Sequence, residues 1–586
     1  MIMTLMDELN QAMGDAFEKA GYDRAFGKVT VSNRPDLCEY QCNGAMATAK
    51  TYRKAPIMIA NDVAACIAEN GPFEAFDAVA PGFINLTLSA AYLARFACEM
   101  AGLPHFGVQT EAPKTVLVDY GGPNVAKPLH IGHLRSAIIG ESVKRILRYL
   151  GNETIGDTHL GDWGTPIGLI IEELKCRQPD LCYFDPSYEG PYPEEAPFTI
   201  AELEEIYPTA SAKSKEDEAF RARALENTLK LQSGDPACHA LWQHIIRISV
   251  EDLKKNYDKL NVHFELWKAE SDAQPYIAGM IEDLETRGIA HESQGALVVD
   301  VAEPDDKREI PPCLIRKSDG ASLYATTDLA TIIWRMKDYP ELRQMIYLAD
   351  KRQELHYTSF FRVARKAGLV PEDMTLQFIG FGTMNGKDGK PFKTRSGGVM
   401  RLESLIAEVE EAVREKMKER YDEIDEKTVS QVALSAIKYG DLSNQATKDY
   451  NFDIERFTSF EGNTGPYILY TIVRIKSILR RAGIEASSSE NLKDLPQDDA
   501  NLKTLLMKIC AFRDVLKDAA EELAPHRICS YIFEVSNAFN SFYHDTQILK
   551  ESDEKKREAY LAVLSLTKDV LETCIDLLGF TAPDKM

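Results

Sequence analysis

The sequence lacks the long apolar runs that a membrane-spanning helix requires. Across its 586 residues no stretch of about 18 apolar residues occurs. The first ten residues include Asp7 and Glu8 and lack the basic segment with which a secretory signal begins. We therefore expect no membrane segment and a cytoplasmic location.

Paired cysteines are also missing. The eleven cysteines are scattered, and none forms a Cys-x-x-Cys pair. The closest two, Cys38 and Cys42, have no second ligand pair nearby, so we interpret them as ordinary thiols. This pattern predicts reduced cysteines and no protein-bound metal.

The sequence also has fewer basic than acidic residues. Lys and Arg number 68 against 91 Asp and Glu, which gives a formal net charge of −23. Such a balance argues against a generally basic nucleic-acid binder. A large acidic protein can still bind nucleic acid through a local basic track, so charge decides nothing here.

What is present describes a globular chain of several domains. Hydrophobic residues make up 44% and charged residues 27% of the sequence, which excludes a disordered protein. Single cores rarely grow past about 250–300 residues, so this length predicts more than one domain.

The most informative stretch begins at residue 115. Residues 115–120 form the short apolar run of a buried parallel strand, and a loop rich in Gly and Pro follows. The residues His-Ile-Gly-His at 130–133 then open a helix that continues at apolar spacing to Gly151. A strand, a tight loop and a helix in this order place a ligand at the carboxyl end of the strand.

The loop has the chemistry of a phosphate site. Gly132 lets backbone approach a ligand, the helix start offers N–H groups, and Lys127 adds a mobile charge. His130 and His133 supply two imidazole donors. Both histidines could instead be ordinary helix-start residues, but the strand, the loop and the glycine agree with the functional interpretation.

These residues resemble a known family. The residues at 130–133 match the HIGH signature of class I aminoacyl-tRNA synthetases, and the loop before them reads Pro-Asn-x-x-Lys-Pro. With His-Leu-Gly-Asp-Trp-Gly at 159–164, the context is similar to arginyl-tRNA synthetases. The resemblance covers nearly the whole chain and is strongest at 115–170, 314–356, 378–402 and 455–480.

The chain divides into regions by pattern. Residues 1–110 predict a small α/β domain with a helix from Leu5 and strands at 29–31 and 83–88. Residues 111–400 predict a Rossmann-type, doubly wound parallel sheet that resumes with strands at 296–301 and 313–316. An acidic, Pro-rich insertion at about 176–235 is expected on the surface and flexible in part.

From residue 401 the pattern is helical. Residues 401–454 predict a helical connector and residues 455–586 an all-α bundle. Amphipathic stretches occur at 402–420, 428–440, 463–482, 501–521, 527–545 and 554–578, with an exposed loop at 487–499.

The resemblance assigns tRNA contacts to the two ends of the chain. It implies that residues 1–110 touch the tRNA elbow, although a purely structural appendage explains them equally well. It implies that the C-terminal bundle binds the anticodon, with Tyr467 and Arg474 as contacts. A solvated basic helix face is the alternative for Arg474.

A second cationic loop lies at residues 386–398. Gly at both ends permits motion, and Lys390, Lys393 and Arg395 could fold over phosphates. Its place matches the KMSK loop of class I enzymes, but Thr394 stands where the second lysine usually is. Arginyl enzymes of this type carry a lysine just before the HIGH signature instead, and Lys127 fills that place. This leaves open how Lys127 and Lys393 divide the contacts with ATP. By itself such a string is more often a surface hairpin.

The resemblance then implies roles. The catalytic residues are Lys127, His130, His133, Lys393 and Arg395. The residues that bind ATP, with Mg²⁺, are Pro123, Asn124, His130, Gly132, His133 and Lys393. The residues that bind arginine are Asp119, Asn124, His159, Tyr324, Asp328 and Gln353. Asp119 and Asp328 could instead be structural or helix-capping carboxylates.

The expected activity is arginine–tRNA ligation. The resemblance implies that ATP and L-arginine form an adenylate, that tRNA(Arg) must be present for this step, and that the enzyme is a monomer. Another class I synthetase, a nucleotidyltransferase and a non-catalytic tRNA-binding paralogue are the alternatives. Neither a basic substrate pocket nor a Cys-rich zinc site is visible, and the intact signature speaks against the paralogue.

Overall fold

The computed structural model describes residues 3–69, 71–110, 112–127, 129–318, 323–387, 389–390, 400–419 and 423–586. Two predicted site residues, Lys393 and Arg395, lie outside the described residues. No helix within these ranges is long and apolar enough to cross a membrane.

The N-terminal region is a four-stranded antiparallel sheet with helices. The strand order is β1-β2-β4-β3, and helix α1 starts at a capping box formed by Thr4 and Asp7. The predicted first helix and both predicted strands are confirmed. The elements are α1 (Leu5–Lys19), β1 (Val29–Val31), β2 (Tyr40–Cys42), α2 (Gly44–Tyr52), α3 (Pro56–Ala64), β3 (Phe73–Val79), β4 (Phe83–Leu88) and α4 (Ala90–Ala101).

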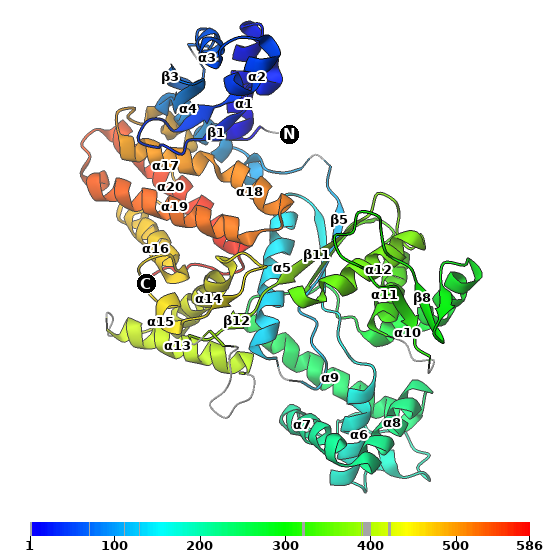
Figure 1. The fold of residues 1–586 in the computed structure, drawn as a ribbon. Coiled ribbons are helices and arrows are strands. Elements are labelled where there is room, and N and C mark those ends of the chain that lie inside the picture. Colours follow the sequence, from blue (N-terminus) through cyan, green and yellow to red (C-terminus); the bar gives the residue numbers. More distant parts are fainter. Residues whose placement is uncertain are drawn as a thin grey trace.

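Residues 111–400 contain a four-stranded parallel sheet of order β11-β10-β5-β6 (Figure 1). Its strands are β5 (Thr115–Asp119), β6 (Glu153–Asp157), β10 (Leu342–Asp350) and β11 (Thr375–Phe381). Val116 and Val118 of β5 join one buried cluster and Leu117 joins another, so helices cover both faces of the sheet. The strand order reverses between β5 and β10, which makes their carboxyl ends the expected ligand site.

Three helices carry the residues around that site. Helix α5 (Ile131–Tyr149) follows β5, whereas α11 (Tyr324–Asp338) precedes β10 and α12 (Glu354–Lys366) follows it. In Figure 1 helix α5 runs through the middle of the molecule, between the sheet and the C-terminal helices. The predicted doubly wound α/β fold is confirmed.

Two predicted strands do not belong to the parallel sheet. β8 (Ala296–Val299) and β9 (Cys313–Arg316) form a separate antiparallel sheet with β7 (His291–Ser293). Between β7 and β8, Gln294 and Gly295 both have positive φ, as a two-residue hairpin turn requires. The turn forces β8 to pair with β7, so the prediction that residues 296–301 and 313–316 continue the parallel sheet is wrong.

The predicted insertion is largely helical. Helices α7 (Ile200–Glu216) and α8 (Glu218–Gln232) bury Leu203, Ile206 and Phe220. They lie beside α6 (Thr165–Arg177), as Figure 1 shows, and α9 (Pro236–Lys259) and α10 (Glu270–Thr286) lead back to the sheet region. Irregular backbone is confined mainly to residues 185–199.

The C-terminal part is helical as predicted. Its helices are α13 (Leu402–Lys418), α14 (Glu426–Leu442), α15 (Ile454–Phe457), α16 (Gly465–Arg481), α17 (Ala500–Cys510), α18 (Phe512–Glu521), α19 (Pro525–Asp545) and α20 (Glu554–Leu577). The expected single helix at 501–521 divides near Ala511. The stretch expected as an exposed loop contains a short 3₁₀ helix, Ser489–Asp494, whose Leu492 is buried.

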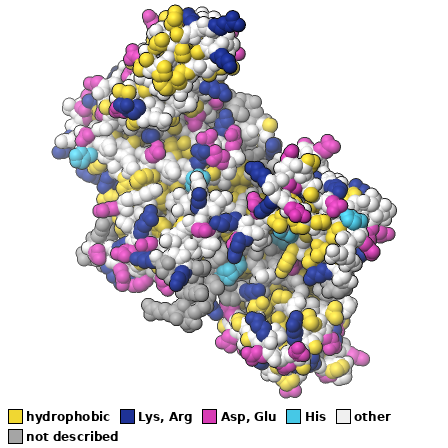
Figure 2. Space-filling view, in the orientation of Figure 1, with side chains coloured by type: hydrophobic (Ala, Val, Ile, Leu, Met, Phe, Trp, Pro, Cys, Tyr) yellow, Lys and Arg dark blue, Asp and Glu magenta, His cyan; other side chains and the backbone are white. Residues whose placement is uncertain are grey.

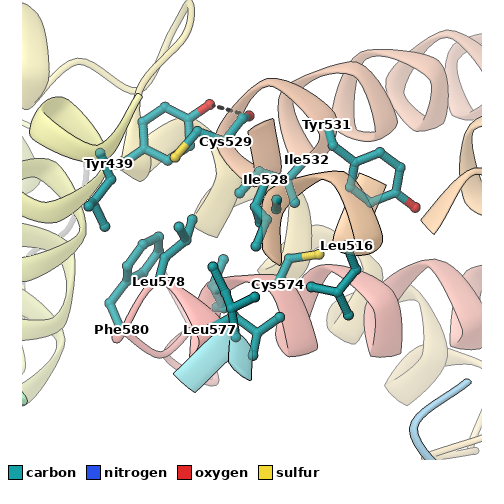
Figure 3. Close-up of a cluster of buried hydrophobic side chains, with 14 of the residues drawn as sticks. Tyr439, Leu516, Ile528, Cys529, Tyr531, Ile532, Cys574, Leu577, Leu578 and Phe580 are labelled. Carbon is teal, nitrogen blue, oxygen red and sulfur yellow. Dashed lines mark hydrogen bonds between the residues drawn. The ribbon is translucent and has the colours of Figure 1, made fainter. Parts of the chain in front are cut away.

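Helices α14, α18, α19 and α20 share one apolar core (Figure 3). Ile528 and Ile532 of α19 face Cys574 and Leu577 of α20, and all four side chains are buried. The hydroxyl of Tyr439 on α14 donates to the carbonyl oxygen of Cys529 at 2.9 Å. This core joins the connector helix α14 to the C-terminal bundle, which we define as α16–α20.

Candidate active site at the end of the parallel sheet

The segment 120–130, here called the active-site loop, is held against the segment that follows β6. The N–H of Val125 donates to Gly161 and the N–H of Gly161 donates to Pro123, at 3.0 and 3.1 Å. A Cβ on Gly122 would lie 2.2 Å from the carbonyl oxygen of His159, so only glycine fits there. Among the predicted ATP contacts, Pro123 is buried and Asn124 is exposed.

The two histidines are fixed by backbone hydrogen bonds. The N–H of Gly132 donates to Nδ1 of His130 at 3.0 Å, and the N–H of His130 donates to Nδ1 of His133 at 3.2 Å. The ring centroids are 3.9 Å apart. Because both Nδ1 atoms accept, a neutral ring must carry its hydrogen on Nε2, which makes each Nε2–H a hydrogen-bond donor.

Both imidazoles are neutral at physiological pH. Burial, and after it the neighbouring His130 and Lys127, lower the pKa of His133 to about 3. Burial and the charge of Lys127 also lower the pKa of His130. The signature therefore presents uncharged hydrogen-bond donors, and Lys127 supplies the positive charge beside them.

Lys127 lies between the signature and the insertion. Its Nζ is 4.6 Å from the ring centroid of Tyr207 on α7. Three residues earlier on the same helix, Glu204 forms an ion pair of 2.8 Å with Arg401. Neither contact could be predicted from the sequence, because no local pattern relates residue 127 to residue 207 or residue 204 to residue 401.

The segment that follows the second loop, from Met400 to Leu402, is bonded to the chain around the start of the signature. The N–H of Ile131 donates to Met400 at 3.2 Å, and the N–H of Leu402 donates to Leu129 at 2.9 Å. These bonds pair the backbone of His130 with that of Arg401. The predicted phosphate ligands Lys393 and Arg395 precede Met400 by a few residues but lie outside the described part of the chain.

Asp119, at the carboxyl end of β5, is paired with a buried arginine. Nη2 of Arg335 on α11 lies 2.5 Å from Asp119 and 2.6 Å from Asp157 at the end of β6. Arg335 is fully buried, whereas the Asp119 side chain keeps 18% of its surface exposed. The pair supports the structural role left open for Asp119, and its contact with arginine stays a prediction. Arg335 was missed because a helix pattern does not distinguish a buried arginine.

Asp328 belongs to a group of carboxylates. Its Oδ2 lies 2.6 Å from Nε2 of His356 on α12, and both side chains are about 30% exposed. Burial, and after it the charges of Asp162 and Asp328, raise the pKa of Glu270 to about 7. Glu270 opens α10 and was missed, because an acidic residue in a first helical turn looks like an ordinary helix-start residue.

The remaining predicted arginine contacts surround the same strand ends. Tyr324 opens α11 with 77% of its surface exposed, and Gln353 is exposed just after β10. Both ring nitrogens of His159 are buried without a hydrogen-bond partner in the described structure. Buried polar atoms without partners are costly, so His159 is well placed to bind a ligand atom.

Three family models together match most of this chain. "tRNA synthetases class I (R), catalytic domain" matches residues 101–454, "DALR anticodon binding domain" matches 468–586, and "Arginyl tRNA synthetase N terminal domain" matches 3–88. The chain belongs to the arginyl-tRNA synthetase family. The predicted family is therefore confirmed, and with it the class I synthetase fold.

Individual relatives of this synthetase agree. The arginine–tRNA ligases of Agathobacter rectalis and Alkaliphilus oremlandii are 58% and 52% identical, each over 99% of this chain and 100% of the relative. The arginyl-tRNA synthetase structure from Plasmodium falciparum superposes with a TM-score of 0.81 at 25% identity and covers all of both chains. The one from Thermus thermophilus gives 0.75 at 23% identity, covering 99% of this chain and all of that one, and so bears on the fold alone.

The predicted tRNA residues of the synthetase lie between α16 and α19. Nη1 of Arg474 donates to Asn540 at 2.7 Å, and its guanidinium lies 4.7 Å from the Tyr470 ring. The Tyr467 hydroxyl accepts from Asn540 and donates to Asn537. Figure 2 shows basic and acidic side chains interspersed over the face of the described part of the molecule that it draws.

Within the described ranges, no group of three or more His, Cys, Asp and Glu side chains could hold a metal ion. Near this point Asp328 is paired with His356, and Asp162 accepts hydrogen bonds from Ser271.

Proposed function

We propose that this chain, an arginine–tRNA ligase, activates arginine at the carboxyl ends of β5 and β10 and then transfers it to tRNA(Arg). The observation that carries the proposal is the arrangement of the signature. Two neutral imidazoles offer Nε2–H donors beside the charge of Lys127, where the strand order reverses. In activation the arginine carboxylate attacks the α-phosphorus of ATP and pyrophosphate leaves.

Positioning and charge stabilisation carry the rate of such a step. We assign the phosphate contacts to His130, His133 and Lys127, with Lys393 and Arg395 of the second loop adding charge. Pro123, Asn124 and Gly132 would line the nucleotide through backbone and short side chains. Mg²⁺ bound with ATP would neutralise part of the triphosphate charge.

The carboxylates select the amino acid. A guanidinium carries five donors and a permanent charge, so it needs acceptors and negative charge. We assign this role to Asp328, joined by Glu270, with Tyr324, Gln353, Asn124 and His159 around the rest of the substrate. Arg335 neutralises part of the Asp119 charge, so we expect Asp119 to contribute less than Asp328.

The remaining assignments concern tRNA and assembly. Tyr467 and Arg474 would contact the anticodon arm, and residues 1–110 the elbow. Residues 111–400 would form the catalytic domain, joined by a connector at 401–454 to the anticodon-binding domain at 455–586. We propose that the enzyme acts as a monomer in the cytoplasm.

The direct test is ATP–pyrophosphate exchange with each amino acid, with and without tRNA(Arg). We expect exchange with arginine alone and only when tRNA is present. Strong exchange with another amino acid would contradict the substrate assignment. Exchange without tRNA would contradict the coupling alone, and no exchange under any condition would favour the non-catalytic alternative.

Asp328→Asn tests the pocket. The change keeps the size but removes the charge and directs new N–H donors at the guanidinium, so the arginine KM should rise at least about 10-fold. The ATP KM should stay unchanged, because the phosphate contacts lie elsewhere. Asp338→Asn, an exposed carboxylate on the same helix, is the matched control. An unchanged arginine KM for Asp328→Asn would show that the pocket is misplaced.

A further inference from the structure

Helix α7 of the insertion contacts the active-site loop and the segment after the second loop at the same time. We propose that α7 forms the outer wall of the ATP site and that Tyr207 is a positioning residue for Lys127. This inference rests on the proposed role of Lys127 at the triphosphate. It gives the insertion a function in ATP binding that its acidic, Pro-rich sequence does not suggest.

The first support is the surroundings of Lys127. Lys127 is three residues before His130, and its charge lowers the pKa of His130 and of His133, so the ammonium is within electrostatic reach of both imidazoles. Its other neighbour is the Tyr207 ring at 4.6 Å, well inside the range of a cation–π contact. A lysine side chain has four rotatable bonds, so without a partner its ammonium would sample many positions. The half-buried ring holds it toward the signature.

The second support is independent of Lys127. Glu204 lies on the same face of α7 as Tyr207, since residues three apart on a helix are neighbours. Its ion pair with Arg401 is 2.8 Å long, and only 15% of the Glu204 side chain is exposed. Arg401 is in turn paired through its backbone with His130. One helix face therefore contacts both the loop that leads into the signature and the segment whose backbone pairs with His130.

The position of α7 is itself well defined. Leu203, Ile206 and Ala210 form a buried stripe on the adjacent face of the helix, which anchors it in the insertion. The active-site loop is also held by α9, where the hydroxyl of Ser249 accepts the N–H of Ala126 at 2.9 Å. The wall thus has a rigid support, as positioning a charge requires.

The test is Tyr207→Leu, which removes the ring face but keeps an apolar side chain. With tRNA present, the ATP KM in pyrophosphate exchange should rise about 3- to 10-fold, the range of a partly desolvated cation–π contact. The arginine KM should stay the same. Tyr207→Phe, which keeps the ring, should restore most of the ATP affinity. Tyr188→Leu is the matched control, a half-buried tyrosine of the same insertion whose ring lies against Tyr192.

A double mutant separates positioning from structural damage. In a Lys127→Met background, Tyr207→Leu should have no further effect on the ATP KM, because the partner is gone. Equal losses in both backgrounds, an unchanged ATP KM, or an equal rise in the arginine KM would each overturn the inference. If Lys127→Met itself leaves ATP use intact, the proposed function of Lys127 has failed, and that result is distinct from a failure of Tyr207.

A second measurement does not depend on Tyr207→Leu folding. Fluorinated phenylalanines at position 207 keep the shape of the ring but progressively weaken the negative potential of its face. The ATP KM should rise stepwise with each added fluorine. A KM that does not follow the number of fluorines would overturn the cation–π assignment.

Discussion

Arg335 and Arg513 are both buried, but they face different partners. In the sheet region Arg335 faces the carboxylates of Asp119 and Asp157. At the edge of the C-terminal bundle Arg513 donates to the backbone carbonyls of Phe106 and Met3, at 2.6 and 3.0 Å. Consistent with this, the nearby carboxylates raise the pKa of Arg335, whereas burial lowers the pKa of Arg513.

The difference separates two uses of a buried cation. At the sheet it balances carboxylates at the carboxyl ends of β5 and β6. In the bundle a buried cation instead bonds backbone carbonyls of a segment that is remote in sequence, here the N-terminal domain bonded by Arg513 of α18. Lys438 on α14 follows the second pattern, since its Nζ donates to the carbonyl of Gly579 at 2.8 Å and burial lowers its pKa to about 7.

The largest expected effect follows from Arg335→Met. Removing this arginine leaves the buried Asp157 and the partly buried Asp119 without a counter-charge, which should cost about 3–5 kcal/mol of unfolding free energy. Arg513→Met leaves only carbonyl groups unpaired and should cost about 1–3 kcal/mol. Urea denaturation of the full chain compares the two. Equal losses would remove the distinction between the two uses.

His133→Ala should give the next largest effect, on rate rather than stability. Loss of one preorganised donor should slow arginine activation about 10²–10³-fold while the protein remains folded. The bundle offers a control, because Ile532→Val should cost about 0.5–1.5 kcal/mol of stability without changing the rate. Near-normal arginine activation by the His133 variant would contradict the assignment of His133 as a phosphate contact.

Lys438 predicts a pH dependence. Its folded pKa of about 7 lies below the usual value of 10.5, so between these values the unfolded chain holds a proton that the folded chain lacks. The free energy of unfolding should therefore rise with pH across this window, by about 1 kcal/mol per pH unit from this group. Below about pH 7 both states hold the proton, so the pH dependence from this group should vanish. The slope difference between the native protein and Lys438→Met measures it. Identical slopes would mean that Lys438 keeps an ordinary pKa.

The smallest effect is expected for Arg474→Gln. If Arg474 contacts a phosphate of the tRNA, its loss should weaken binding less than about tenfold and reduce the salt slope by about 1. Arg527→Gln on α19 is the control, since Arg527 is already paired with Glu522 at 2.5 Å. Titrations at several salt concentrations measure both. An unchanged slope for Arg474→Gln would return this side chain to a structural role.

Much of the catalytic motif could be predicted from local sequence. The strand at 115–119, the glycine-bearing loop and the helix from 131 each have a local cause, and they agree with one another. The C-terminal helices were equally clear, because their apolar spacing extends over many turns. The break at Ala511 was not, since no proline or glycine marks it.

What the sequence did not reveal depends on partners remote in the chain. The strand at 296–299 had the right pattern, but its sheet was set by the turn at Gln294 and Gly295. Arg335 looks like any cation on a helix until two strand ends bring carboxylates to it. The Lys127–Tyr207 contact joins residues eighty positions apart, and no local periodicity reports such a pairing.

Helix α5 links the histidine signature directly to the C-terminal bundle. It has 19 residues and is about 28 Å long, with the histidine signature at its start. Near its other end, Ser142 donates to the carbonyl of Leu577 at 2.9 Å and Arg145 bonds Asp576 at 3.0 Å, both at the end of α20. A chimera that exchanges the bundle for that of another synthetase must therefore keep these contacts between α5 and the end of α20. A chimera without them would lose part of the packing that positions α5.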